Sequence, residues 1–192
     1  MAQARTRLTS AEFRAFCELP QNAHRRFELH EGEIVEVPSP SPLHQWIVAE
    51  LLYFLKVFLR MHPLGYVFGD NLDYEPVDGV IVQPDLSFVS FERAPSLPER
   101  FQLMPDLAVE VISPSNTERD MLRKVLLYFA YGAREVWVVY PEERMVRVYT
   151  PAAQGAYVRQ FAEGEQLTES AVLPNFALNV ADLFPKAQQA RE

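Results

Sequence analysis

Apolar and polar residues alternate in several short runs along the chain, and this period of two predicts β-strands. One run alternates on both sides of a Glu-Gly turn, which predicts a hairpin with strands near residues 26–30 and 33–37. Two longer runs with the same character cover residues 65–75 and 79–90. Pro84 has no N–H to donate, so the second of these runs is either an edge strand or is interrupted there.

The second half of the chain contains four further runs of strand type: DLAVEVIS (106–113), EVWVVYP (135–141), MVRVYTP (145–151) and YVRQFAEGE (157–165). EVWVVYP is apolar on both faces, which predicts a central strand that is covered on two sides. The last two runs should extend the sheet by hairpins, and ADLFP near the C-terminus predicts a turn or short helix.

Two segments in the first third of the chain predict helices. Thr9 and Glu12 form a plausible capping box for a short helix over residues 10–19. The apolar stretch over residues 44–61 is too long for a strand and too interrupted by charge for a membrane span. It therefore predicts a helix that faces the core.

A third helix is predicted over residues 117–131, with Gly132 at its C-terminal end. The turn before it offers two cap pairs, Ser115/Glu118 or Thr117/Asp120. The segment FERAPSLPERFQLMP has three prolines and no period, which is typical of a long loop. The order of elements predicts an α/β fold of the α+β type, in which helices flank a mixed β-sheet with added β-hairpins.

Length and composition favour one domain over residues 1–192. With 192 residues and 48% hydrophobic content, the chain can build one full core. Cys17 is the only cysteine, so no internal disulfide can form. Neither a membrane span nor a secretory leader is visible, and we therefore expect a cytoplasmic protein without membrane contact.

The net charge of −8 and a pI near 5.1 argue against a protein that coats nucleic acid by long-range attraction. Any contact with a polyanion must be local. Basic residues gather in two places, which are either binding patches or solvated faces: Arg25-Arg26, and Arg119, Arg123, Lys124 and Arg134.

Glu110 interrupts an otherwise apolar strand, where an unpaired carboxylate would cost several kcal/mol or take up a proton. Alternation along residues 107–113 places Glu110 on the same side as Ala108 and Ile112. One interpretation is a functional site. The other is a buried carboxylate that is satisfied by Lys124 or Arg134.

Asp85 is the natural companion of Glu110, because strands that pair lie about 4.8 Å apart and the two carboxylates could then converge. Converging carboxylates repel one another unless a proton or a cation lies between them, and a hard cation such as Mg²⁺ suits such a site. Lys124 shares a helical stripe with Asp120 and Tyr128 and borders the core. Alternatively, Asp85 is only a turn acceptor and Lys124 an ordinary surface partner of Asp120.

The sequence resembles the Uma-two family of predicted nucleases, which is placed in the PD-(D/E)xK restriction-endonuclease-like superfamily. The resemblance covers about residues 6–184 and implies a restriction-endonuclease-like core. It rests on RRFELHEGEIVEVPSPSPLHQWIV, VQPDLSFV, PDLAVEVISPSN with DMLRKVLLYFAYGAREVWVVYP, and VLPNFALNVADLF.

The resemblance implies a metal-dependent endonuclease that hydrolyses DNA. Asp85, Glu110 and the backbone carbonyl of Ile112 would bind Mg²⁺ or Mn²⁺. The superfamily pattern expects a lysine at position 112, where this chain has isoleucine, and Lys124 on the following helix is the residue that matches instead. Glu28 would be a third acid of the catalytic site, and His44 a further polar residue.

Three functional hypotheses remain open from the sequence. The first is the metal-dependent nuclease, and the second is a catalytically weak or inactive module of the same fold that binds nucleic acid or protein. A glycosidase that uses Glu28 and Glu110 as paired acids is the third, although no carbohydrate-stacking cleft is evident. We also expect a homodimer, because loop 92–105 and the C-terminal strands offer apolar surface.

Overall fold

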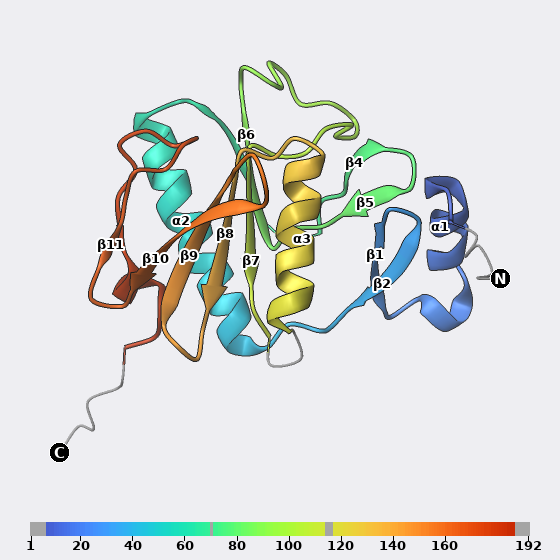
Figure 1. Cartoon of the computed structure of the whole chain (residues 1–192), viewed down its shortest axis with the longest axis horizontal. Coiled ribbons are helices and arrows are strands. Elements are labelled where there is room, and N and C mark those ends of the chain that lie inside the picture. The colour runs from blue at the N-terminus through green and yellow to red at the C-terminus, as the bar shows by residue number, and fades with distance from the viewer. Residues whose placement is uncertain (1–6, 70, 114–116, 187–192) are drawn as a thin grey trace.

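The computed structural model describes residues 7–69, 71–113 and 117–186, and it shows a mixed sheet with helices on both faces (Figure 1). Its helices are α1 (Ser10–Cys17), α2 (Pro42–Met61), α3 (Glu118–Ala130) and the 3-10 turns η1 (Pro20–Asn22) and η2 (Val180–Leu183). Its strands are β1 (Arg26–His30), β2 (Glu33–Val37), β3 (Gly65–Phe68), β4 (Tyr74–Val77), β5 (Val80–Val82), β6 (Leu86–Ser90), β7 (Leu107–Val111), β8 (Glu135–Tyr140), β9 (Met145–Pro151), β10 (Ala156–Ala162), β11 (Gln166–Leu167) and β12 (Leu178–Asn179).

The main sheet has the strand order β10-β9-β8-β7-β6-β3 within the described residues. β7 and β8 run parallel, and α3 is the crossover between them, whereas every other pair in this sheet is antiparallel. The predicted mixed sheet is therefore confirmed. The fully buried β8 lies inside the sheet, as its apolar sequence on both faces predicts.

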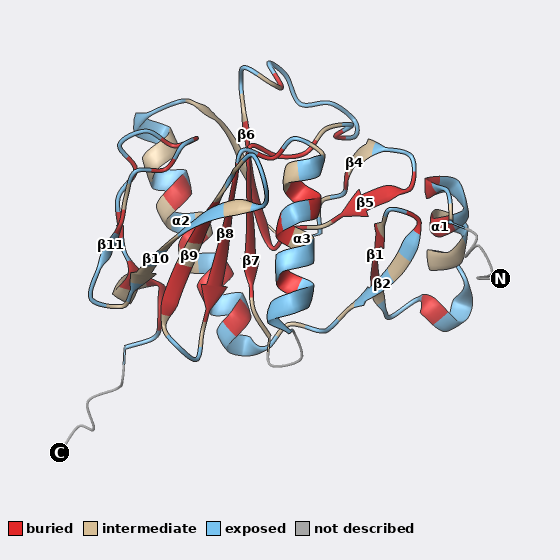
Figure 2. Cartoon of the chain, in the orientation of Figure 1, coloured by how far each residue is buried: buried red, intermediate tan, exposed pale blue. Residues whose placement is uncertain are grey.

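Two hydrophobic clusters cover the two faces of this sheet. α2 packs on one face through Ile47, Leu51 and Leu55, against inward residues of β6, β7, β8 and β9. On the opposite face, α3 packs through Val125 and Tyr128. Figure 2 shows the main-sheet strands β7 and β8 buried between these helices. Alternation along the strands has thus separated their side chains into two layers.

A second, smaller sheet has the order β2-β1-β5-β4 and lies beside α3 (Figure 1). β1 and β2 pair from Arg26↔Val37 to His30↔Glu33, which confirms the predicted hairpin. A small core of Phe13, Phe27, Leu29 and Ile81 joins α1 to this sheet.

Local signals in the sequence account for most element boundaries. Thr9 and Glu12 form the predicted capping box of α1. The Thr117 side chain caps α3 by accepting the N–H of Asp120. The alternative cap residue Ser115 lies outside the described residues, as do residues 114–116 of the turn predicted over SPSNT (113–117). Pro84 interrupts its run, so that β5 belongs to the small sheet and β6 to the main sheet. No helix in the described ranges is both long enough and apolar enough to span a bilayer.

Candidate active site

The pairing of β6 with β7 brings Asp85 and Glu110 to one end of the sheet. The register runs from Phe88↔Leu107 to Leu86↔Val109, and one further step in the same register sets Asp85 opposite Glu110. Side chains alternate along each strand, so both carboxylates point to the face that α3 covers. The convergence expected from the sequence is therefore present in the fold.

Asp85 is held by two groups from different elements. Its Oδ2 accepts the backbone N–H of Val111 at 2.7 Å and lies 3.0 Å from Nε2 of His44. His44 is buried in the first turn of α2, where the Ser41 side chain accepts its N–H. The structure thus brings the predicted site residue His44 onto Asp85, and these two contacts orient the carboxylate.

Glu110 is bound by two side chains of α3 that lie one turn apart. Nζ of Lys124 lies 2.9 Å from each oxygen of the Glu110 carboxylate. The Tyr128 hydroxyl donates to Oε1 of the same group at 2.6 Å. Lys124 is therefore not a surface partner of Asp120, whose carboxylate accepts the Thr117 hydroxyl at the start of α3. Arg134, the other suggested partner of Glu110, pairs with Asp106.

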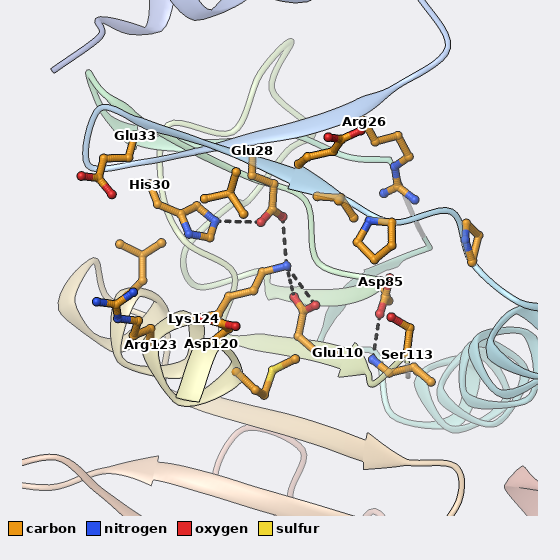
Figure 3. A pocket seen from close by; sticks show the side chains of 18 of the residues that line it. Arg26, Glu28, His30, Glu33, Asp85, Glu110, Ser113, Asp120, Arg123 and Lys124 are labelled. Carbon is orange, nitrogen blue, oxygen red and sulfur yellow. Dashed lines mark hydrogen bonds and ion pairs between the residues drawn. The ribbon is translucent and has the colours of Figure 1, made fainter. Parts of the chain in front are cut away.

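Glu28 reaches the same lysine from the opposite side of the pocket (Figure 3). Its Oε1 lies 3.0 Å from Nζ of Lys124 and accepts the N–H of Gln83 at 2.7 Å. Its Oε2 lies 2.8 Å from Nε2 of His30. A carboxylate in a hairpin strand is usually exposed, but Glu28 is buried because this face of β1 is turned towards α3.

His30 was not anticipated as a site residue. It lies two positions after Glu28 on β1, and the period of two places both side chains on one face of the strand. The signal was present in the sequence. The spacing alone does not show that this face of β1 lines the pocket, because that depends on the packing of the small sheet against α3.

Burial and neighbouring charges raise the pKa of Glu110 but leave that of Glu28 lowered. Burial raises the pKa of Glu110, and repulsion from Asp85 and Glu28 adds to this effect; the attraction of Lys124 offsets it only in part, so the pKa is raised to about 8. Burial also raises the pKa of Glu28, but attraction to Lys124 and the bond with His30 outweigh it and lower the pKa to about 2. The carboxylates in turn hold the pKa of Lys124 above its ordinary value despite burial.

The cluster lines a pocket of about 420 Å³ between the hairpin β1–β2 and α3 (Figure 3). Acidic and basic side chains both surround it. The acids beyond the central three are Glu31, Glu33, Glu36 and Asp120, and the cations besides Lys124 are Arg7, Arg26 and Arg123. The pocket is large enough for a small polar group, and buried carboxylates outnumber the ammonium at its centre.

The donor set fits a hard divalent cation. Mg²⁺ is commonly held by one or two carboxylates and retains several waters, and Asp85 and Glu110 would supply two oxygen ligands at the end of the β6–β7 pair. No group of three or more His, Cys, Asp or Glu side chains arranged to hold a metal occurs in residues 7–69, 71–113 and 117–186. Any such ion would therefore depend on backbone oxygens and water for its remaining ligands.

Ile112 differs from the other predicted site residues in its position. Its N–H donates to the carbonyl of Val139 across the sheet, and its partly buried side chain packs against the hydrophobic cluster beneath α3. The neighbouring residues Val111 and Ser113 line the pocket, whereas Ile112 does not. The carbonyl of Ile112 as a metal ligand therefore stays a prediction.

Comparison with known proteins gives a family and a structural relative. A family described as "Uma2: Putative restriction endonuclease" matches residues 11–181. The chain is also similar to a crystal structure described as "a putative nuclease belonging to DUF820" from Anabaena variabilis ATCC 29413. That similarity has a TM-score of 0.74 with 22% sequence identity, and it covers 88% of this chain and 94% of the other. No curated protein matches the chain.

Proposed function

Because the chain belongs to the Uma2 family, we propose that it is a metal-dependent nuclease that hydrolyses phosphodiester bonds of DNA. One observation carries the proposal. Three buried carboxylates, from Glu28, Asp85 and Glu110, meet one ammonium, that of Lys124, whose side chain is only 13% exposed, in one pocket at the end of the main sheet. Structural ion pairs are usually balanced, and this cluster has an excess of oxygen ligands.

Asp85 and Glu110 would hold the ion, either Mg²⁺ or Mn²⁺. When bound, it would lower the pKa of a coordinated water and neutralise charge that builds on the phosphate. The N–H of Val111 and the ring of His44 keep Asp85 oriented. The Tyr128 hydroxyl does the same for Glu110. These contacts hold both carboxylates in position before a substrate arrives.

Lys124 would act directly on the reacting phosphate or on the attacking water. Its ammonium is a compact charge with three donors, and Glu28 holds it at the centre of the pocket. As a donor at this position, it would stabilise negative charge that develops in the transition state. Glu28 would therefore act through Lys124, as a positioning residue.

Contacts with the rest of the substrate would be local. Arg26 and Arg123 line the pocket and could bind flanking phosphates, and the exposed Arg119 lies one turn before Arg123 on α3. The acidic side chains at the same mouth oppose long-range attraction of DNA. We therefore expect weak binding that falls steeply with salt.

The decisive experiment is cleavage of supercoiled and branched DNA with Mg²⁺ or Mn²⁺. We expect wild-type protein to cleave at least one of these substrates, and Asp85→Asn and Glu110→Gln to be inactive. Asp182→Asn and Glu163→Gln are matched controls, because these acids lie outside the pocket and bind Asn179 and Arg144. Titration calorimetry with Mn²⁺ alone should show binding to wild type and to the controls but not to Asp85→Asn. Absence of both cleavage and Mn²⁺ binding in wild type would refute the proposal.

A second candidate function is a non-catalytic module of the same fold that binds nucleic acid. The observation in its favour is that Lys124 already pairs with both Glu28 and Glu110, an arrangement that could be purely structural. DNA that is retained by wild-type protein but never cleaved, with no effect of Mn²⁺, would support this alternative. If the protein forms a homodimer, its two nuclease sites would suit the two strands of a duplex.

A further inference from the structure

The two carboxylates proposed to hold the metal lie at the bottom of a pocket and are not on an open surface. Asp85 and Glu110 are only 8% and 5% exposed. The hairpin β1–β2 lies across the pocket from α3, and Glu28 on β1 contacts the Lys124 ammonium at 3.0 Å (Figure 3). A phosphodiester that reaches both metal-binding carboxylates must therefore enter between the hairpin and the helix.

The size of this pocket matches one nucleotide. Its volume is about 420 Å³, and protein pockets of about 300–1,000 Å³ hold one drug-sized molecule. The scissile phosphate is bonded to a sugar on each side, so it cannot reach the bottom of the pocket without part of its nucleotide. A nucleotide of a duplex would first have to leave its base pair and its stack, which costs free energy that an unpaired nucleotide does not need.

One wall of the pocket is apolar and comes from the hairpin. Val35 on β2 pairs directly with Glu28 on β1, and Val37 pairs in the same way with Arg26. Residues that pair directly in a sheet point to the same face, and both valines line the pocket. Val35 is 38% exposed, although its neighbour Glu28 is only 1% exposed. Such a wall suits a sugar or the face of a base, and stacking covers the base faces in a duplex.

Charge around the pocket also favours one strand over two. Exposed carboxylates of Glu31, Glu33 and Asp120 line it, and Arg26 and Arg123 are the nearby cations. Duplex DNA carries one negative charge for about every 1.7 Å of its axis, which is twice the density of one of its strands. The acidic side chains therefore repel a duplex more strongly. Two arginines are enough to contact the phosphates on either side of one nucleotide.

We propose that the pocket accepts one unpaired nucleotide, so that the substrate is single-stranded DNA or an unpaired stretch within a duplex, such as a bulge or a flap. The phosphate would lie at Asp85, Glu110 and Lys124, with its sugar or base against Val35 and Val37. Intact duplex would have to open at the site before it could be cleaved. This preference presupposes the proposed nuclease activity and adds the strand state on which the enzyme acts.

Cleavage of three labelled oligonucleotides by the full chain with Mn²⁺ tests the preference. The substrates are a strand without self-complementarity, the same strand in a fully paired duplex, and that duplex with a central bulge of unpaired nucleotides. The single strand should be cleaved about a hundredfold faster than the paired duplex, and the bulged duplex only in its unpaired part. A ratio below about tenfold would overturn the preference and leave the nuclease function intact. If none of the three is cleaved, both proposals fail.

Replacement of Val35 by serine tests the apolar wall. Val35→Ser should raise KM for the single strand by about threefold or more and keep kcat within about twofold, because the wall would bind substrate and transition state alike. Val158→Ser is the matched control, since Val158 is an exposed valine (56%) on β10 outside the pocket, and both constants should stay at wild-type values. An unchanged KM in Val35→Ser, or an equal rise in Val158→Ser, would overturn the role of the wall. Far-UV circular dichroism of both variants establishes that the fold is retained.

Discussion

Replacement of Lys124 by methionine should make the stability of this protein depend strongly on pH. Lys124 is 13% exposed and is shared by two buried carboxylates, those of Glu28 and Glu110. Methionine keeps most of the side-chain volume and removes the charge. The variant must therefore either hold the Glu28 carboxylate buried without this cation or take up a proton.

The magnitude follows from proton linkage. In wild type, the pKa of Glu110 is already raised to about 8, so Glu110 carries a proton below that pH with or without the lysine. The pKa of Glu28 is lowered to about 2, with Lys124 as the main lowering influence. Loss of the lysine therefore adds about one proton to the folded variant, on Glu28. The unfolded chain holds no such proton above its ordinary carboxyl pKa of 4.5.

A folded state that binds one extra proton loses about 1.4 kcal/mol of stability relative to wild type for each unit of rising pH. Over the three units from pH 5 to pH 8, the penalty grows by about 4 kcal/mol. This agrees with the general cost of about 3–5 kcal/mol for breaking a buried ion pair. We expect Lys124→Met to be near wild type in stability at pH 5 and severely destabilised at pH 8.

Urea denaturation at pH 5, 6, 7 and 8 without divalent ions measures this difference. Lys186→Met is the matched control, because Lys186 is exposed and should show no pH-dependent loss. In the Lys124→Met background, Glu28→Gln should flatten the pH dependence, since the site of the extra proton is removed. A penalty that is the same at pH 5 and pH 8, or is below about 0.5 kcal/mol throughout, would refute the reasoning.

Three further predictions concern the same cluster. Lys124→Arg should keep the fold but lose about a hundredfold in DNA cleavage, because a planar guanidinium replaces a compact ammonium; full activity in a plasmid-nicking assay would contradict a direct role for Lys124. Tyr128→Phe removes the 2.6 Å donor to Glu110, so the pKa of Glu110 should rise further above its ordinary value and Mn²⁺ affinity at pH 7 should fall; unchanged calorimetric affinity would argue against Glu110 as a ligand. Glu28, with a pKa lowered to about 2, contributes stability that is complete above pH 4.5 and is lost as the pH falls towards 2. The acid-induced loss of stability in urea titrations should therefore be smaller in Glu28→Gln, and an identical acid profile would contradict this assignment.

Local patterns in the sequence were enough for most of the elements and for half of the site, although the short elements η1, β11 and β12 were not predicted. The hairpin at 26–30 and 33–37, the cap of α1 and the interruption at Pro84 depend on neighbouring residues only, and all three occur as predicted. Alternation also placed Asp85 and Glu110 on one face, because the direction of a side chain in a strand depends only on the parity of its position. The family resemblance implied a role for Lys124, and the position of Lys124 two turns into α3 lets its ammonium reach Glu110.

Tertiary packing decided the remainder. Glu28 has the sequence pattern of a solvent-facing strand residue, and it is buried because the hairpin β1–β2 is placed against α3. His30 and His44 entered the site for the same reason, since their partners Glu28 and Asp85 come from packed elements that no local pattern relates. Periodicity specifies which side of an element is apolar or polar. Which other element covers that side depends on contacts between residues far apart in the chain, and these contacts raise the pKa of Glu110 and lower that of Glu28.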